Sequence, residues 1–113
     1  MLPECLFCRI VRREIPATIV QEDEQALVFK DVTPQAPTHL LVVPKKHLDA
    51  LSASSDGDTA LLGHLQRTAA KAAEAVKLSS FRLVTNNGKA AGQSVDHLHY
   101  HLLGGRPMQW PPG

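Results

Sequence analysis

Three histidines alternate with apolar residues near the end of the chain, in the segment His97-Leu98-His99-Tyr100-His101-Leu102-Leu103. If this segment is an extended strand, the three imidazoles share one face, with neighbours roughly 6.6 Å apart along the chain. Each imidazole carries polar nitrogens that need partners, so a row of three is poorly explained as core packing. The row therefore indicates a chemical site.

Two chemistries suit such a row of histidines. Three imidazoles can hold a catalytic zinc ion. Alternatively, a neutral imidazole nitrogen attacks phosphorus, while the other nitrogen of the same ring donates a hydrogen bond that fixes the tautomer and stabilises the developing positive charge. The residue pattern alone leaves both chemistries open.

A short glycine-containing segment, Gly92-Gln93-Ser94-Val95, precedes the row. Gly92 permits close backbone approach, and Gln93 and Ser94 can offer amides or a hydroxyl to a phosphate oxygen. A phosphate under attack needs a nucleophile together with donors for its oxygens. The closeness of the two segments in sequence predicts a single site for both.

The elements that position this site are predicted from hydrophobic periodicity and from proline and glycine. The predicted strands cover residues 18–21, 26–30, 39–43, 81–85 and 95–103, and the predicted helices cover residues 5–13 and 58–77. His39 and His47 stand near the two ends of the third strand, while His64 lies on the long helix and is expected to be a surface or packing residue. This order predicts an α+β fold, a mostly antiparallel five-stranded sheet packed by one long and one short helix.

Composition limits the classes of protein to which the chain can belong. Its 113 residues suit one domain spanning 1–113, and 12 Lys and Arg against 11 Asp and Glu leave almost no field to attract a nucleic acid polymer or an acidic membrane. No apolar run is long enough to cross a bilayer, and the first residues do not form a secretory signal. We therefore expect a cytoplasmic protein without a membrane or nucleic acid polymer as partner.

The residues of the histidine row match the His-x-His-x-His-x-x pattern of the histidine triad (HIT) superfamily. The chain also resembles the histidine triad nucleotide-binding (Hint) branch in an ordered set of segments. They are residues 7–16, 31–39, 44–47, 92–95, 104–106 and the ending Trp110-Pro111-Pro112-Gly113. The resemblance implies a HIT-like fold whose sheet continues across a homodimer, and a purine nucleoside phosphoramidase of bacterial type.

The resemblance also implies the reaction and the roles of individual residues. Purine nucleoside 5′-phosphoramidates, such as adenosine phosphoramidate and aminoacyl or lysyl adenylates, would be hydrolysed through a covalent nucleotidyl-histidine without any required cofactor. His99 would be the nucleophile, His39 would sit behind it and orient it, His97 would support it, and Ser94 would contact the leaving amine. The implied nucleotide-binding residues are Phe7, Ile10, Asp31, Val32, Leu41, Asn86, Gly92, Gln93, Ser94, Val95, His99, His101 and Trp110.

Within that set, the base pocket would be walled by Phe7, Ile10, Val32 and Leu41, with Asp31 as the ribose-binding acid. His101 and the amides near Ser94 would hold the α-phosphate, Asn86 would complete that site, and Trp110 would reach the site of the partner subunit. Asp96 departs from the family, because an aromatic residue is common at that position. It adds a negative charge on the opposite face from the histidine row.

The only two cysteines, Cys5 and Cys8, suit metal or redox chemistry rather than a disulfide framework. Together with His47 and His97 they resemble the structural zinc site of some bacterial members, whereas other members lack the cysteines. A reduced pair of buried thiols is the alternative.

The sequence is therefore compatible with three functions: a metal-independent phosphoramidase, a zinc hydrolase that uses the histidine row as ligands, and a purine nucleotide-binding or scaffold module with incidental catalysis.

Overall fold

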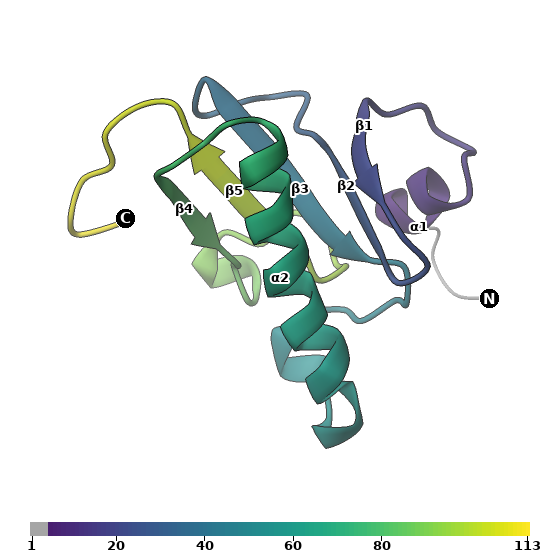
Figure 1. Cartoon of the computed structure of the whole chain (residues 1–113). Coiled ribbons are helices and arrows are strands. Elements are labelled where there is room, and N and C mark those ends of the chain that lie inside the picture. The colour runs from purple at the N-terminus through teal and green to yellow at the C-terminus, as the bar shows by residue number, and fades with distance from the viewer. Residues whose placement is uncertain (1–4) are drawn as a thin grey trace.

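The computed structural model describes residues 5–113, which form two α-helices and five strands (Figure 1). The helices are α1 (Leu6–Val11) and α2 (Thr59–Ala75). The strands are β1 (Ile19–Glu22), β2 (Ala26–Lys30), β3 (Thr38–Pro44), β4 (Phe81–Val84) and β5 (Tyr100–Gly104). Short 3-10 turns lie at Leu51–Ala53, Asp56–Asp58 and Lys89–Ala91. The predicted fold class is confirmed, with an α+β fold of one long and one short helix.

The five strands form one sheet in the order β1-β2-β3-β5-β4, and every neighbouring pair is antiparallel. The first two predicted strands correspond to β1 and β2, which pair as an antiparallel hairpin. β5 lies between β3 and β4, so its residues are paired on both sides, with Leu102 opposite Leu40 and Leu83. The last histidine of the row, His101, is therefore carried by a strand inside the sheet.

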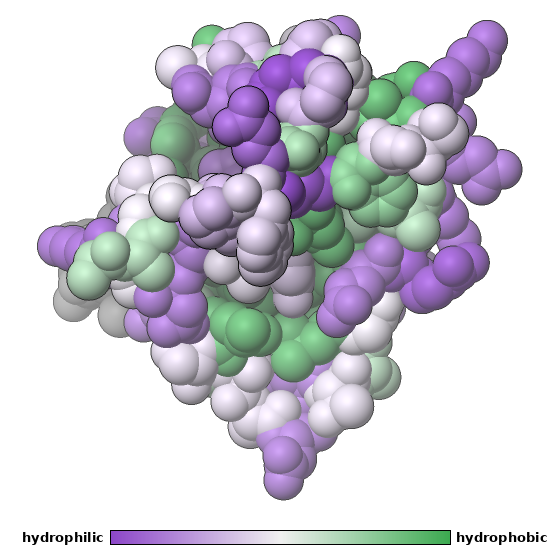
Figure 2. Space-filling model, turned by 90° about the vertical axis from the view of Figure 1, so that its left-hand side faces the viewer, coloured by the Kyte–Doolittle hydropathy of each residue, from purple (hydrophilic) through white to green (hydrophobic). Residues whose placement is uncertain are grey.

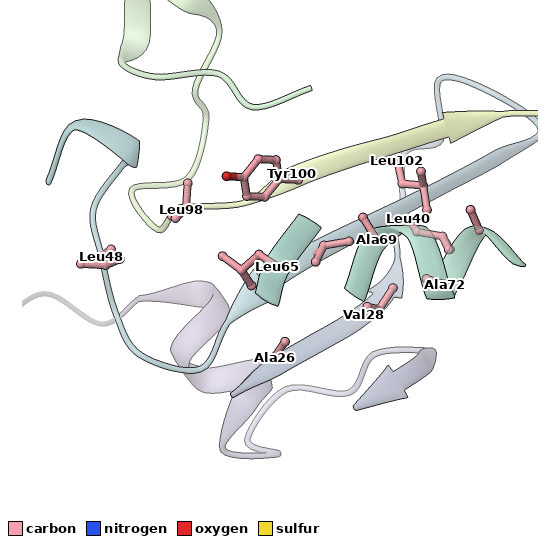
Figure 3. Packing of buried hydrophobic residues seen from close by; sticks show 12 residues of the cluster. Ala26, Val28, Leu40, Leu48, Leu65, Ala69, Ala72, Leu98, Tyr100 and Leu102 are labelled. Atoms are coloured by element: carbon pink, nitrogen blue, oxygen red, sulfur yellow. The ribbon is translucent and has the colours of Figure 1, made fainter. Parts of the chain in front are cut away.

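The two faces of the sheet bury different sets of side chains. On one face, Leu65, Ala69 and Ala72 of α2 pack against Val28, Leu40 and Leu102 (Figure 3). On the other face, α1 contributes Phe7 and Ile10 to a smaller cluster with Leu27, Phe29, Leu41 and Val43. Because both faces are covered, β2 and β3 are buried along almost their whole length. α1 therefore covers the face of the sheet towards which His97 and His99 point, and α2 covers the opposite face.

The predicted last strand, residues 95–103, is wrong at its start. β5 begins only at Tyr100, and residues 95–99 form bends and irregular backbone. The backbone N–H of Leu98 donates to the carbonyl oxygen of Leu48, and that of His97 donates to Val95. These bonds turn the segment away from the ladder that β3 offers. The predicted alternation still holds in the packing, because Leu98, Tyr100 and Leu102 belong to the cluster under α2, whereas His97 and His99 contact Phe7 of α1.

The long helix begins at Thr59, one residue after the predicted start. Asp58 lies just before it and is buried, and its carboxylate accepts hydrogen bonds from the backbone N–H of Ser55 and from Lys46. No helix within residues 5–113 is long and apolar enough to cross a bilayer.

Candidate functional site

A cavity of about 300 Å³ lies between α1, the end of β2, the middle of β3, and the segment leading into β5. Among its lining residues are nine of the predicted nucleotide-binding positions, which are Phe7, Ile10, Asp31, Val32, Leu41, Ser94, Val95, His99 and His101. Its walls at α1 and Leu41 are apolar, while Asp31, Ser94 and the two histidines supply polar groups. An apolar slot with a few convergent polar groups is the usual form of a small-molecule site.

The tautomer of His99 follows from one hydrogen bond. Its Nδ1 lies 2.7 Å from the carbonyl oxygen of His97. A carbonyl oxygen only accepts, so Nδ1 carries the hydrogen and Nε2 of the neutral ring keeps its lone pair. His99 is 4% exposed and lines the cavity. The geometry thus supplies an imidazole with one nitrogen anchored and the other available as a nucleophile.

His101 receives the opposite tautomer through a relay of hydrogen bonds. The backbone N–H of Gln35 donates to Nδ1 of His39 at 3.0 Å, which leaves the hydrogen of that ring on Nε2. Nε2 of His39 then donates to Nδ1 of His101 at 2.9 Å, with Asp31 Oδ2 also 3.3 Å away. His101 therefore carries its own hydrogen on Nε2, where it can donate to an anion.

This relay corrects the predicted role of His39. His39 was expected behind the nucleophile, but its ring hydrogen-bonds His101, and the nucleophile is oriented by the carbonyl oxygen of His97. Burial lowers the pKa of His39, opposed by the Asp31 carboxylate. Burial, and then the neighbouring rings of His99 and His39, lowers the pKa of His101 to about 4. Both rings are therefore neutral at pH 7, as the relay requires.

The lowered pKa of His101 predicts a pH dependence of stability. Its pKa is about 4 in the folded chain against an ordinary 6.5, so between these values the unfolded chain binds a proton that the folded chain does not. The free energy of unfolding should therefore fall as the pH is lowered from 6.5 towards 4. Replacing His101 with Gln should make that fall shallower, because one partly buried ring that resists protonation is removed. The titratable groups His99, His39 and Asp31 around the position are present in both proteins.

Urea denaturation of wild type and His101→Gln at several pH values measures this effect. A chelator in every sample keeps metal release from contributing to the slope. Parallel pH profiles for the two proteins would contradict the assignment of His101 as a ring kept neutral by its surroundings.

The loop before the histidine segment is held by the side chain of Gln93. This buried amide accepts a hydrogen bond from the backbone N–H of Gly88, and its Nε2 donates to the carbonyl oxygens of Asp49 and Val95. The backbone N–H of Gln93 donates to Gly88. Gln93 was predicted to bind the nucleotide, but all these donors are used inside the protein, so it positions the loop instead.

Gly92 adopts a φ of 99°, a left-handed conformation that glycine enters without strain, and it ends the 3-10 turn of this loop. Its own backbone N–H donates to Lys89. Within residues 5–113, the backbone N–H groups of Ser94 and Val95 have no hydrogen-bond acceptor. These amides and the exposed Ser94 hydroxyl are therefore the donors that the loop can present to a ligand.

Asn86 and Trp110, two other predicted nucleotide-binding residues, do not line the apolar cavity. Asn86 lines a second, more open hollow of about 570 Å³ that also includes His101, Arg82 and Arg106 and is bordered by the C-terminal tail. Asn86 lies beside the loop that contains Gly92, because a Cβ built on Gly92 would be 3.5 Å from the side-chain nitrogen of Asn86. Trp110 is 82% exposed and lines neither hollow. Within this chain it is not brought to the site.

The two cysteines meet two histidines at the start of α1. Sγ of Cys5 is 3.3 Å from Nδ1 of His97, Sγ of Cys8 is 3.3 Å from Nδ1 of His47, and the two Nδ1 atoms are 3.1 Å apart. His97 Nε2 donates to the carbonyl oxygen of Pro44 and His47 Nε2 donates to Asp49. Both Nδ1 lone pairs are therefore turned inward towards each other and the sulfur atoms.

This arrangement fits a tetrahedral zinc ion. Zinc bonds of about 2.0–2.3 Å to nitrogen and sulfur give ligand-to-ligand distances of about 3.3–3.8 Å, close to those observed. Two lone pairs facing each other at 3.1 Å repel unless a cation or a donor lies between them. The outer hydrogen bonds to Pro44 and Asp49 are the kind that orient histidine ligands. Burial also lowers the pKa of His97 to about 4, which keeps its ring neutral.

A second group of metal-capable side chains consists of Asp31 and His101, which line the cavity, and of His39 beside them. It is a poor ligand set, because the Gln35 amide forces the hydrogen of His39 onto the nitrogen that faces the other two. Within residues 5–113, no candidate group joins His97, His99 and His101 around one point. The histidine row therefore does not form the ligand set that a zinc hydrolase would need.

Several positioning groups escaped sequence reasoning. The carbonyl oxygen of His99 accepts a hydrogen bond from the Thr85 hydroxyl at 2.8 Å, just beyond β4. The Gln35 amide, the Pro44 carbonyl and Asp49 set the tautomers of His39, His97 and His47. Only Asp49, two residues after a histidine, had a local signal, since the others act through the backbone or across strands.

Comparison with known proteins gives consistent likenesses. A sequence model of the HIT domain matches residues 12–108. An uncharacterised HIT-like protein of Synechocystis sp. is 55% identical over 114 residues, with both chains covered to 100%. The crystal structure of a HIT family hydrolase from Legionella pneumophila is 52% identical, with a TM-score of 0.95 over 97% of this chain and 100% of that one. A histidine triad nucleotide-binding protein from Candida albicans is 30% identical, with a TM-score of 0.82 over 96% and 83%.

Proposed function

Because the chain belongs to the HIT domain family, we propose that it hydrolyses purine nucleoside 5′-phosphoramidates through a covalent nucleotidyl-histidine on His99. The observation that carries this proposal is the hydrogen bond from His99 Nδ1 to the carbonyl oxygen of His97, which leaves Nε2 as a lone-pair donor at the cavity. The similar Legionella pneumophila protein is named a hydrolase and the Candida albicans protein nucleotide-binding. Both names agree with the proposal.

In the first step, Nε2 of His99 attacks the α-phosphorus, the P–N bond breaks, and the amine leaves after gaining a proton from solvent. The new nucleotidyl-imidazole keeps its Nδ1 hydrogen, whose bond to His97 stabilises the positive charge on the ring. The Ser94 hydroxyl donates to the leaving nitrogen. In the second step, water attacks phosphorus and loses a proton to solvent, the P–Nε2 bond breaks, and the nucleoside monophosphate leaves with the neutral histidine restored.

The remaining groups of the cavity recognise the nucleotide. The purine lies against the apolar walls formed by Phe7, Ile10 and Leu41, with Val32 at the mouth. Asp31 accepts one hydrogen bond from the Thr33 backbone N–H through Oδ1, so its carboxylate keeps lone pairs for the ribose hydroxyls. The phosphate oxygens receive hydrogen bonds from Nε2 of His101 and from the amides of Ser94 and Val95, with Asn86 beside them.

Intact-mass analysis tests the covalent step. Wild-type protein mixed briefly with adenosine phosphoramidate and quenched in denaturant at neutral or alkaline pH should gain the mass of one adenylyl group, because acid would cleave the P–N bond to histidine. The His99→Ala variant should gain none. The proposal would be overturned if wild type and variant both turned over the substrate and neither formed an adduct. If wild type bound AMP but showed neither adduct nor turnover, a binding module would be favoured.

We also propose that Cys5, Cys8, His47 and His97 hold a structural zinc ion, because their donor atoms and outer hydrogen bonds fit one. Purified protein should contain one zinc per chain by elemental mass spectrometry, and the Cys8→Ser variant much less. Added zinc should raise the Tm of the metal-free protein, since a ligand that binds only the folded state stabilises it. Unchanged Tm and metal-free wild type would contradict the site.

Chelation separates the phosphoramidase from a zinc hydrolase. The adduct on His99 should still form after zinc is removed, because no step of the proposed chemistry uses the metal. Complete loss of adduct and turnover on chelation, with full recovery on adding zinc to folded protein, would instead favour metal catalysis.

We further propose a homodimer in which the β4 edges of two chains pair and continue the sheet. β4 is an edge strand of the sheet, and its Phe81 is 41% exposed. The side of the molecule shown in Figure 2 has apolar surface between polar residues. Pairing would cover an otherwise exposed edge, and Trp110 of one chain would reach the site of the other. Light scattering after size exclusion should give twice the chain mass, and a monomer at all concentrations would contradict the dimer.

A further inference from the structure

His97 belongs to two clusters at once. Its ring faces the two sulfur atoms, with Nδ1 3.3 Å from Sγ of Cys5 and 3.6 Å from Sγ of Cys8. Its carbonyl oxygen, 2.7 Å from His99 Nδ1, is the acceptor that orients the proposed nucleophile. The residue is fully buried and bonded through Nε2 to Pro44, so a displacement of the ring moves the backbone that carries this acceptor.

α1 provides a second link between the thiols and the nucleophile. Phe7 lies between the two cysteines in sequence, and its ring packs edge-on against both His97 and His99, with centroids 5.8 and 5.0 Å apart. The backbone N–H of Cys8 donates to Sγ of Cys5 at the start of the helix. A change in the bonding of either sulfur therefore acts on a helix turn that touches both rings.

We infer that Cys5 and Cys8 form an oxidisable thiol pair whose state sets the position of His99 through His97. The four donor atoms of this cluster lie within 4.8 Å of one another, and both cysteines are partly exposed. A disulfide requires the sulfur atoms to come to about 2.05 Å. Once joined, they cannot both keep their contacts with the two imidazoles. The link to catalysis rests on the function proposed above.

The oxidant that the step requires is a peroxide. The two thiols lose two protons and two electrons, one S–S bond forms, and hydrogen peroxide takes up these protons and electrons as its O–O bond breaks to give two waters. If a divalent ion is bound, both sulfur ligands are consumed and the ion is released. A dithiol reductant reverses the bond, since it supplies the two electrons and two protons.

The test uses the wild-type protein, so it does not depend on a variant that folds. Zinc-loaded, reduced protein is treated with hydrogen peroxide, and intact mass, zinc release to a chromogenic chelator and adenosine phosphoramidate turnover are followed together. We expect the mass to fall by two hydrogens, zinc to be released, and kcat to fall by about tenfold to about a hundredfold, as is typical when supporting groups are lost. Dithiothreitol with added zinc should restore kcat.

A second readout reports on His99 without any turnover. In protein labelled with ¹⁵N-histidine, long-range ¹⁵N–¹H spectra distinguish the two ring tautomers and the hydrogen bond at Nδ1. The spectrum of His99, assigned with His99→Ala, should change on disulfide formation and return on reduction. This readout stands even if wild type shows no turnover, in which case the proposed function fails and the spectrum alone decides the coupling.

Two variants provide controls for the oxidation. Cys5→Ser with Cys8→Ser should lose the peroxide response of the spectrum and of kcat. Met108→Leu, which removes another oxidisable sulfur, should keep it. The inference is overturned if peroxide forms no disulfide, or if the disulfide forms while turnover and the His99 spectrum stay unchanged.

Discussion

Replacement of His99 with Gly is expected to lower adenosine phosphoramidate turnover by at least about a thousandfold. Among residues 5–113, no other side chain lining the cavity has an anchored ring with its lone pair free at the cavity. His101 does not substitute, since its lone-pair nitrogen is already occupied by His39. Binding of AMP should persist, because the apolar walls and Asp31 remain. Steady-state and single-turnover kinetics measure the first effect, and titration calorimetry with AMP measures the second.

The glycine variant also allows a rescue experiment. Imidazole in solution can enter the space left by the side chain and attack phosphorus, so high imidazole concentrations should restore part of the turnover. The His64→Gln variant is the matched control, because His64 lies on α2 and hydrogen-bonds Asp23. It should turn over like wild type. Full activity of His99→Gly without imidazole would remove His99 from the reaction.

Replacement of Leu102 with Ala is expected to lower the free energy of unfolding by about 2–5 kcal/mol, the range for truncating a buried leucine. Leu102 is fully buried in the middle of β5, opposite Leu40 and Leu83, and packs under α2. The cavity left behind is closed in by strands on both sides, so the surroundings can relax only in part. Urea denaturation measures the change.

The control for this stability effect is Leu51→Ala. Leu51 is 37% exposed on a short 3-10 turn, so its truncation should change stability by less than about 1 kcal/mol. A loss of similar size in both variants would contradict the packing described for β5. Because Leu102 and His101 project to opposite faces of one strand, Leu102→Ala that remains folded should also retain adduct formation on His99.

The sequence predicted most residues that line the cavity, but it did not predict the hydrogen bonds that hold them in place. Nine predicted nucleotide-binding residues line one cavity, although they come from α1, the loop after β2, β3, the segment before β5 and β5 itself. Gln93 was misassigned because a glutamine beside a glycine and a serine is equally suited to bind a phosphate or to hold a loop. Only the positions of Gly88, Asp49 and Val95 decide that it holds the loop.

The start of β5 shows the same limit for secondary structure. Alternating apolar residues predict a strand from residue 95, and the alternation of faces survives in the packing of Leu98 and Tyr100. The backbone nevertheless joins the sheet only at Tyr100, because the backbone N–H of Leu98 donates to the carbonyl oxygen of Leu48. A local sequence pattern predicts which face each side chain occupies. The length of a β-strand also depends on which backbone groups of distant segments are available for hydrogen bonds.

By itself, the sequence determined the order of elements, the common face of the three histidines and the resemblance to a family, because periodicity and motif spacing are local properties. The tertiary structure alone separated the histidines into different chemical roles. The carbonyl of Pro44 turns the lone pair of His97 to the cysteines, the carbonyl of His97 turns that of His99 to the cavity, and Gln35 acts through His39 on His101. An imidazole has two similar nitrogens, so its tautomer is set by the partner that reaches each one, and most of these partners arrive from other segments of the fold.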